Sequence, residues 1–230
     1  MLSTSFNQYS EFISTNKLSN DKSGNERLQI VGNKIKNAVE GYYASIGKSS
    51  ELQGFSWEFN LIEAEDVNAW CMPGGKIVVY TGLLKVATTE EDLAVVIGHE
   101  VAHAVAKHGS ERMSQVLITN FGGAVLTEAI KDKPSEVQAF WMASYGVGTN
   151  LGYILPYSRT HEYEADYLGM VFMARAGYHP YYAVRFWDKM ERYSASGNTP
   201  EFLSTHPTST NRIKELNSKY QEVVKKHYKE

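Results

Sequence analysis

The chain has 230 residues, of which 43% are hydrophobic and 12% aromatic, enough to bury a core of ordinary domain size. Its 23 basic and 26 acidic residues give a net charge of −3, and no block of Lys or Arg occurs, which argues against nucleic acid as a partner. The single cysteine, Cys71, excludes an internal disulfide bond. We expect its thiol to be a small buried side chain in a strand rather than a reactive nucleophile.

The N-terminal segment, residues 1–24, is polar and rich in Ser and Asn. It lacks the basic start and the apolar centre of a signal peptide. A longer protein whose export or lipid-anchoring segment lies outside this sequence would also show a Met directly before such a stretch. We therefore predict one domain over residues 1–230, folded mainly within 25–230, and keep membrane anchoring through a missing N-terminal segment as a hypothesis.

The predicted elements change from mixed to helical along the chain. Residues 25–46 carry apolar side chains at helical spacing and predict an amphipathic helix. Strand-like patterns follow at residues 55–63, 67–72 and 76–80. From Glu90 onward the pattern is helical almost to the end, with breaks at 122–123, 133–134, 177–180 and 196–207. A small sheet followed mainly by helices predicts an α+β fold.

One apolar stretch, from Phe140 to Leu155, is long enough to raise the question of a membrane span. It is shorter than the roughly 20 residues that a spanning helix needs, and it contains Ser144, Thr149 and Asn150. We therefore expect no transmembrane helix in this chain. We interpret the stretch as buried or interfacial backbone, with a membrane-contacting hairpin as the alternative.

An HExxH motif, from His99 to His103, lies in the strongly helical segment that begins at Glu90. Residues four apart on a helix differ by about 40° in direction, so both imidazoles project from one face and can bind one tetrahedral ion. Glu100 then flanks the ion, while Ile97 and Val101 face the opposite side, toward the core. The alternative is an ordinary helix with two surface or core histidines.

A zinc ion held in this way needs a third protein ligand and an open position for water. Glu162 fits this need, because it shares a predicted helix face with Asp166 four residues later. Asp166 would then accept the free ring N–H of a ligand histidine and fix its tautomer. Glu164 points about 200° away from Glu162 and ranks behind it. The alternative is a solvated acidic face with Arg159.

Three separated stretches resemble the zinc endopeptidases grouped with the CAAX prenyl protease, the HtpX-like proteases and the mitochondrial Oma-type protease. They are NAWCMPGGKIVVYTGLL at 68–84, GHEVAHAVAKH at 98–108 and SRTHEYEADYLG at 158–169, with a weaker fourth, HPTSTNRI, at 206–213. The resemblance implies a mainly helical, gluzincin-like domain with a small mixed sheet and an HExxH active-site helix. In that family the first Glu of the ExEAD run is the third zinc ligand and its Asp supports a ligand, which assigns these roles to Glu162 and Asp166.

The resemblance also implies a substrate-binding strand. The strand after the Pro-Gly-Gly turn would be an edge strand that pairs with an extended peptide. The Asn-Ala pair that precedes this turn resembles one that gluzincins use to hold the substrate backbone. The alternative is that both pieces are simply strand and turn chemistry. The predicted substrate-binding residues are Asn68, Ala69, Gly74, Gly75, Lys76 and Ile77.

The C-terminal stretch contains His206 and, six residues later at the start of the last predicted helix, Arg212. Together they resemble a family element that overhangs the active site. His206 would stabilise the oxyanion or occupy the open zinc position in a resting enzyme, and Arg212 would help to hold the oxyanion. The alternative for His206 is a loop histidine near a helix cap. The remaining histidines have no partner at ligand spacing and are read as surface or packing residues: His108, His161, His179 and His227.

These residues predict a zinc-dependent endopeptidase with one Zn²⁺ per chain, in which Glu100 is the general base. Its substrates would be extended or misfolded polypeptides, and its place the cell envelope or periplasm, as for the soluble or lipid-anchored bacterial members of the family, with the cytoplasm as the alternative. Two other functions stay open. One is a zinc-containing binding or assembly factor in which the His206 loop plugs the site. The other is a purely structural zinc site with four protein ligands.

Overall fold

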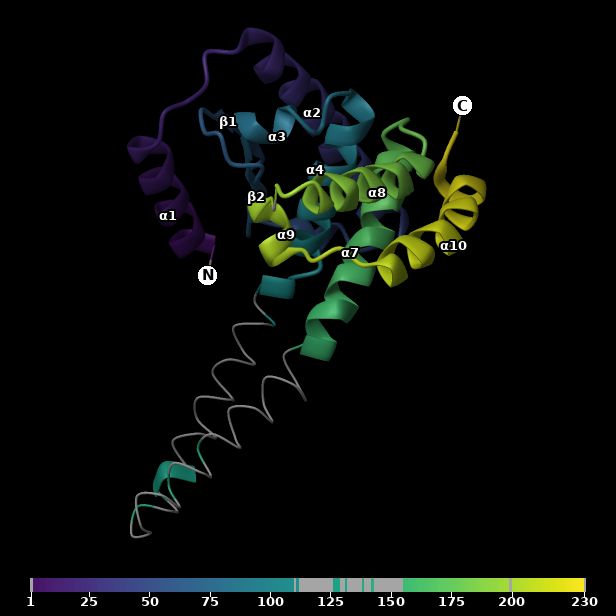
Figure 1. The fold of residues 1–230 in the computed structure, drawn as a ribbon. Coiled ribbons are helices and arrows are strands. Elements are labelled where there is room, and N and C mark those ends of the chain that lie inside the picture. Colours follow the sequence, from purple (N-terminus) through teal and green to yellow (C-terminus); the bar gives the residue numbers. More distant parts are fainter. Residues whose placement is uncertain are drawn as a thin grey trace. The chain divides into compact units, whose positions relative to one another are not determined.

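The computed structural model describes residues 2–109, 111, 126–128, 131, 138, 142, 155–198 and 200–229. The chain forms two compact units, the first made of Met1–Ala106 with Tyr163–Glu230 and the second of Lys107–Glu162. The described part is mainly helical with one small sheet, which confirms the predicted α+β class (Figure 1). The single domain predicted over residues 1–230 stays a prediction.

The first unit contains one mixed sheet of three strands, β1 (Glu58–Ile62), β2 (Ala69–Met72) and β3 (Lys76–Tyr80). Their order is β1–β3–β2, with β1 parallel and β2 antiparallel to β3. The strand after the Pro-Gly-Gly turn is therefore the central strand, and the prediction that it is an edge strand is wrong. Lys76 and Ile77 are buried between two neighbouring strands and have no free backbone edge to offer a peptide. The edges of this sheet are β1 and β2.

The turn between β2 and β3 explains the two glycines that were predicted to bind substrate. Gly74 and Gly75 have φ angles of +94° and +81°, in the left-handed region that favours glycine. A Cβ atom at Gly74 would meet the ring of Phe6, and one at Gly75 would meet the ring of Trp57. Both glycines are thus needed to close the turn under packed aromatic rings, which is a structural role.

The N-terminal segment forms a helix, α1 (Leu2–Thr15), that the sequence did not indicate. Tyr9 packs with Ile62 and Val78 in a small cluster on one face of the sheet, and the ring of Phe12 meets that of Trp70 at 4.9 Å. The other face of the sheet packs on the main core, which α2 (Lys22–Ser45) and α4 (Glu90–Val105) share. Helix α1 therefore covers the face of the sheet that points away from the main core (Figure 1).

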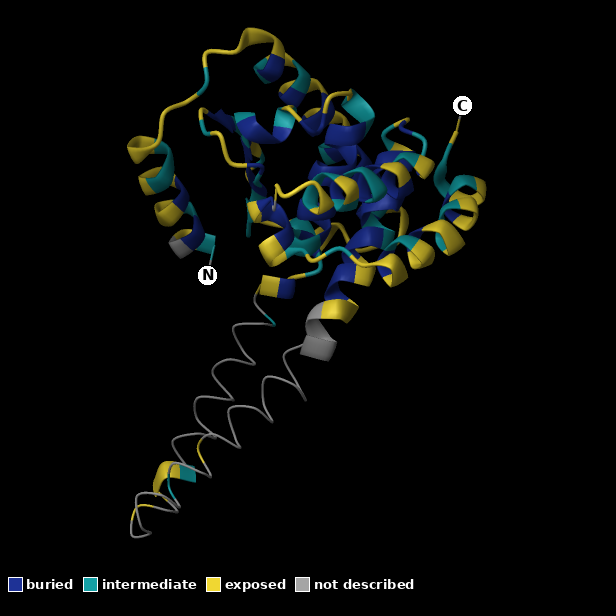
Figure 2. Cartoon of the chain, viewed as in Figure 1, coloured by how far each residue is buried: buried dark blue, intermediate teal, exposed yellow. Residues whose placement is uncertain are grey.

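The predicted helices around the core are confirmed with small shifts of their ends. Helix α2 begins at Lys22, after Asp21, whose side chain accepts a hydrogen bond from the Gly24 N–H. The Thr89 side chain caps α4 in the same way, and three acidic residues follow in its first turn. Twelve of the 16 residues of α4 are buried, and the helix is mostly dark blue in Figure 2. Such a helix is packed by neighbouring elements on most of its sides.

Two short elements complete the N-terminal part, a 3₁₀ turn (Ser49–Leu52) and helix α3 (Thr81–Leu84).

The described residues of the C-terminal half form further helices. Helix α7 covers Leu155–Arg175, and α8 (Tyr181–Ala195) follows the predicted break at residues 177–180. The predicted break at residues 196–207 contains a short helix, α9 (Glu201–Thr205), and α10 (Thr210–His227) begins after its cap, Ser209. These helices, with α2 and α4, enclose the main core.

Helices α4 and α7 cross with their backbones in contact at two glycines. A Cβ atom at Gly98 would lie 3.1 Å from the carbonyl oxygen of Gly169, and one at Gly169 would lie 3.1 Å from the backbone nitrogen of His99. The neighbouring atoms are backbone and cannot rotate away. This close crossing brings the face of α7 that carries Asp166 directly against the turn of α4 that carries His99.

Replacing Gly169 by Ala is therefore expected to lower the free energy of unfolding by about 1–3 kcal/mol, because the added methyl group forces the two helices apart. Urea unfolding of the metal-free protein measures this change. Gly41→Ala is the matched control, since Gly41 is exposed in α2 with open space around its Cα. That control is expected to gain about 0.5–1 kcal/mol from helix propensity. Equal stability of Gly169→Ala and the parent would contradict the tight crossing.

Two sequence predictions fall mainly outside the described residues. They are the breaks at 122–123 and 133–134, and the apolar stretch from Phe140 to Leu155, of which only Met142 and Leu155 are described. Among the helices that the structure describes, none has both the length and the apolar character needed to cross a membrane.

Candidate metal and catalytic site

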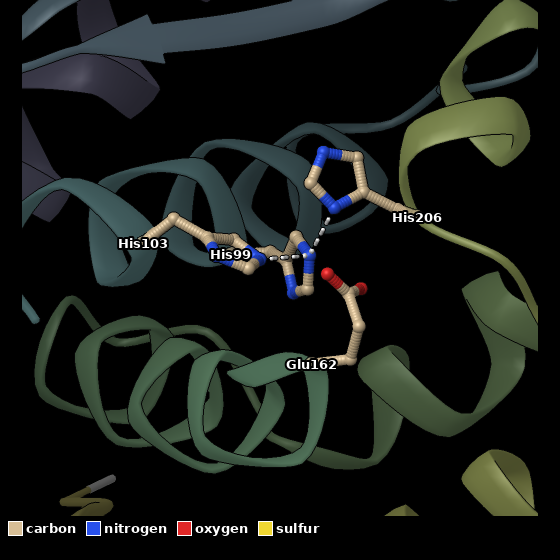
Figure 3. A group of neighbouring side chains, drawn as sticks. All are labelled: His99, His103, Glu162 and His206. Atoms are coloured by element: carbon tan, nitrogen blue, oxygen red, sulfur yellow. Dashed lines mark hydrogen bonds between the residues drawn. The ribbon is translucent and has the colours of Figure 1, made fainter. Parts of the chain in front are cut away.

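Four side chains meet with their ligand atoms within 4.8 Å of one another: His99, His103, Glu162 and His206. The two histidines of the HExxH motif come from α4, the carboxylate from α7, and His206 from the segment after α9 (Figure 3). Helix α7 continues without a break from Glu162 into the first unit. Glu162 is buried, whereas Glu164 is exposed, as the predicted ranking of the two carboxylates requires.

The imidazoles of the motif point their Nε2 atoms at one place. Nε2 of His103 lies 3.1 Å from Nε2 of His99, which in turn lies 3.2 Å from Nδ1 of His206. Two nitrogens bound at about 2.0–2.1 Å to one tetrahedral zinc ion are roughly 3.3 Å apart. Imidazole nitrogens and a carboxylate oxygen are also the donor types that zinc prefers. The four residues therefore fit a zinc ion in both spacing and chemistry.

Glu100 lies beside this group on the same turn of α4. It is 4% exposed, and its Oε1 lies 3.3 Å from Nε2 of His206. A carboxylate this close to a metal position, and not needed as one of its ligands, is placed to accept a proton from a water molecule there.

Asp166 stands behind His99, as the sequence predicted. Its Oδ1 lies 3.0 Å from Nδ1 of His99, so the ring donates its Nδ1–H to the carboxylate and turns the Nε2 lone pair toward the metal position. Burial works to raise the pKa of Asp166. The charge of Arg212 and the hydrogen bonds from Arg212 and His99 outweigh burial and hold the pKa below its ordinary value. Asp166 is therefore an anion that orients His99.

Arg212 is buried and binds residues that support the site, and its predicted help in holding the oxyanion stays a prediction. It is 2% exposed, and its Nε and Nη2 bind the two carboxylate oxygens of Asp166 at 2.6 and 2.8 Å. Its Nη1 donates to the backbone carbonyls of His206 and Pro207 at 3.3 and 3.2 Å. The guanidinium thus binds Asp166 and the His206 segment, and its Nη2 also lies 3.4 Å from both ring nitrogens of His99.

Two aromatic residues lie at the site although the sequence did not indicate them. Trp187 of α8 meets the His99 ring edge-on at 5.4 Å and stacks on Phe202 of α9 at 5.8 Å. Phe202 in turn lies 4.8 Å from the His206 ring. These rings form a continuous wall behind two of the four clustered histidine and glutamate side chains. In the sequence they are aromatic residues like many others, because only the packing of α8 and α9 brings them to the histidines.

A second pair of histidines, which the sequence predicted to be surface or packing residues without a partner at ligand spacing, packs ring on ring. Within the second unit, His108 and His161 are buried, and their rings stack at 4.2 Å with an angle of 12° between the planes. Nε2 of His161 lies 3.2 Å from Oε2 of Glu111. The two residues are 53 positions apart, so no local spacing indicates this pair. His179 and His227 contact aromatic rings and lie outside the cluster, as predicted.

The edge strand β2 packs against α4 and begins at Ala69, the second residue of the predicted Asn-Ala pair. The Tyr80 N–H donates to the Asn68 carbonyl at 3.1 Å, so these two residues form a hydrogen-bonded pair of the antiparallel ladder. Such pairs alternate along the strand, and Ala69 and Cys71 therefore direct their backbone N–H and C=O groups away from β3. The side chain of Asn68 accepts a hydrogen bond from the Ala69 N–H at 2.9 Å.

Cys71 lies on this edge strand with a thiol that is hard to ionise. Removal from water raises the pKa of Cys71 well above its ordinary value, and the negative charge of Glu100 adds to the effect. A thiol of this kind is a poor nucleophile. This agrees with the expected packing role for Cys71.

The sequence matches Peptidase family M48 over residues 31–220. It is 37% identical over 169 residues to mitochondrial metalloendopeptidase OMA1 of Arabidopsis thaliana, which covers 73% of this chain and 32% of the relative. The corresponding human metalloendopeptidase OMA1, mitochondrial, is 31% identical over 172 residues, covering 72% of this chain and 32% of the relative. The beta-barrel assembly-enhancing protease of Escherichia coli (strain K12) is 28% identical over 167 residues, covering 68% and 33%.

The chain spans about a third of the length of these three relatives. The comparisons confirm the predicted family of peptidases, and the relatives are themselves named as metalloendopeptidases or as a protease. Since the family match covers most of its residues, the chain belongs to peptidase family M48.

Proposed function

We propose that this chain is a zinc-dependent endopeptidase that hydrolyses peptide bonds in extended or unfolded polypeptides. His99, His103 and Glu162 would hold one Zn²⁺, and Glu100 would be the general base. The observation that carries the proposal is the meeting of two imidazoles and a carboxylate from separate helices at one point, with Glu100 beside them.

The residues around this point divide the work of hydrolysis. A bound zinc ion would supply a Lewis acid that acidifies water and polarises the scissile carbonyl. Glu100 accepts the proton of the attacking water and passes it to the leaving amine. Asp166 keeps the Nδ1–H of His99 occupied, so that Nε2 always faces the site. The rings of Trp187 and Phe202 pack against His99 and His206 and would exclude water from that side of the two histidines.

The open edge of β2 is the proposed binding place for substrate. A peptide in extended conformation can add to this edge through the outward backbone groups of Ala69 and Cys71. Asn68 would exchange its hydrogen bond to Ala69 for one to the peptide backbone. This mode of binding recognises the peptide backbone and favours unfolded segments, because most backbone groups of a folded protein are already hydrogen-bonded within its own helices and sheets.

The proposed setting is protein quality control in a cell envelope, with misfolded polypeptides as substrates. The names of two relatives support this, since one is a mitochondrial metalloendopeptidase and the other a beta-barrel assembly-enhancing protease.

The test is metal analysis of the purified protein together with digestion of casein, an unstructured protein. We expect one zinc per chain, cleavage of casein, loss of cleavage with a chelator and its return on adding Zn²⁺. Protein that purifies without metal and takes up none would overturn the proposal.

A second candidate is an assembly factor whose peptidase activity is held back by His206. The observation that favours it is the presence of His206 among the four clustered ligand atoms, where its Nδ1 lies 3.2 Å from Nε2 of His99. A histidine in that place occupies the position that water and substrate need.

Replacing His206 by Ala is expected to raise the rate of casein cleavage several-fold at unchanged zinc content, because it opens the fourth position. His179→Ala is the control, since His179 packs against Tyr228 away from the cluster. A fall in kcat at unchanged zinc content would instead mean that His206 stabilises the oxyanion. Full zinc content without activity in both parent and variant would favour a structural zinc site.

A further inference from the structure

Arg212 joins parts of the site that are far apart in the sequence. Its guanidinium contacts Asp166 of α7, the His99 ring of α4, the backbone of the His206 segment and the ring of Trp187 in α8. Cζ of Arg212 lies 3.7 Å from the centre of the Trp187 ring, which sets the plane of the guanidinium. The hydrogen bonds then leave from the edge of that plane in two directions.

The two directions differ in strength. Toward Asp166, Nε and Nη2 form a forked pair with a carboxylate at 2.6 and 2.8 Å, inside a buried region. Charge-assisted bonds of this length are roughly twice as strong as neutral ones. Toward the loop, a single nitrogen, Nη1, is shared between two neutral carbonyls at 3.3 and 3.2 Å. The grip on Asp166 is therefore the tighter one.

We infer that Arg212 is a positioning residue that holds the metal ligand His99 tightly, mainly through the forked pair with Asp166, and the His206 segment loosely. The loop can then leave its place while the guanidinium stays on Asp166, and Asp166 keeps its bond to Nδ1 of His99. Movement of the His206 segment would then open the site while His99 keeps its position. This inference rests on the proposed function and concerns how the same site is regulated.

Arg212→Lys tests the inference. Lysine keeps the positive charge beside Asp166 but loses the two-bond pair with the carboxylate and the Nη1 atom that binds the His206 segment. We compare four proteins: the parent, Arg212→Lys, His206→Ala and the double variant. Zn²⁺ affinity is measured by competition with a chelating dye, and ligand geometry by the visible spectrum after Co²⁺ replacement. Arg192→Lys is the matched control, since Arg192 is an exposed arginine paired with an aspartate of its own helix.

Arg212→Lys is expected to weaken Zn²⁺ binding about 10–100-fold and to shift the Co²⁺ spectrum, while Arg192→Lys changes neither. The fold-changes of Arg212→Lys and His206→Ala should multiply in the double variant to within about threefold, because Arg212 acts on His99 whether or not the loop is in place. Unchanged Zn²⁺ affinity in Arg212→Lys, or an effect that disappears in the His206→Ala background, would overturn the inference.

Asp166→Asn covers the case in which Arg212→Lys does not fold. It removes the charge that the fork binds, and the same loss of Zn²⁺ affinity and shift of the Co²⁺ spectrum are expected. Unaltered affinity and spectrum in folded Asp166→Asn count against the inference. The two levels of failure are distinct: a parent that binds no Zn²⁺ defeats the proposed function, whereas a parent that binds Zn²⁺ as tightly as Arg212→Lys defeats only the inference.

Discussion

Glu100→Gln is expected to keep its zinc and to lose cleavage, with kcat/KM for casein reduced by about two to four orders of magnitude. Glutamine has the size and shape of glutamate, so the buried pocket around position 100 stays filled. Its amide cannot accept the proton of the attacking water. The measurement is zinc content by metal analysis and casein hydrolysis on the same preparation.

The control for this variant is Glu91→Gln, which changes the same residue type two turns earlier in α4, where it is remote from the histidine cluster. It should retain both metal and activity. Cleavage by Glu100→Gln at the parent's rate, in a preparation free of other proteases, would show that another group is the base. Loss of zinc from Glu100→Gln would mean that Glu100 is a ligand.

Glu162→Gln is expected to lose most of its affinity for Zn²⁺. Removing the hydrogen-bonding partner of a ligand costs roughly 10–100-fold in metal affinity, and removing the charged ligand itself should cost more. Casein cleavage should fall in proportion to the zinc lost and return in part at high Zn²⁺ concentration. Chelating-dye competition measures the affinity, and the dependence of cleavage on added Zn²⁺ measures the recovery.

Glu164→Gln is the matched control, because it removes the same charge two residues away on the exposed side of α7. It should bind Zn²⁺ as the parent does. Should Glu164→Gln lose zinc while Glu162→Gln keeps it, the ligand assignment on α7 is reversed. Equal affinity in all three proteins would leave the site without a carboxylate ligand.

Residue spacing predicts side-chain positions most accurately when both residues lie on the same helix. The four-residue interval between His99 and His103 predicts a shared face on any α-helix, and the two Nε2 atoms lie 3.1 Å apart. The interval between Glu162 and Asp166 predicts in the same way that both side chains face one neighbour. In the structure that neighbour is the turn of α4 at His99.

The order of the strands could not be obtained in this way. Alternation and β-branching found all three strands, and the segment at 76–80 has the predicted bounds. Which strand lies between the other two depends on how the connections cross, and nothing in the composition of β3 records that β1 pairs with it in parallel. The open edge therefore falls on β2, next to the Asn-Ala pair, and not on the strand after the turn.

The sequence by itself determined the fold class, the helix that carries His99, Glu100 and His103, and, through resemblance, the carboxylates of α7. The tertiary structure alone decided that β2 is the edge, that Arg212 supports Asp166, and that Trp187 lies against His99. The reason is physical. Periodicity reports which side chains share a face of one element, whereas contacts between elements depend on crossings such as that of Gly98 and Gly169, which form only when the whole core packs.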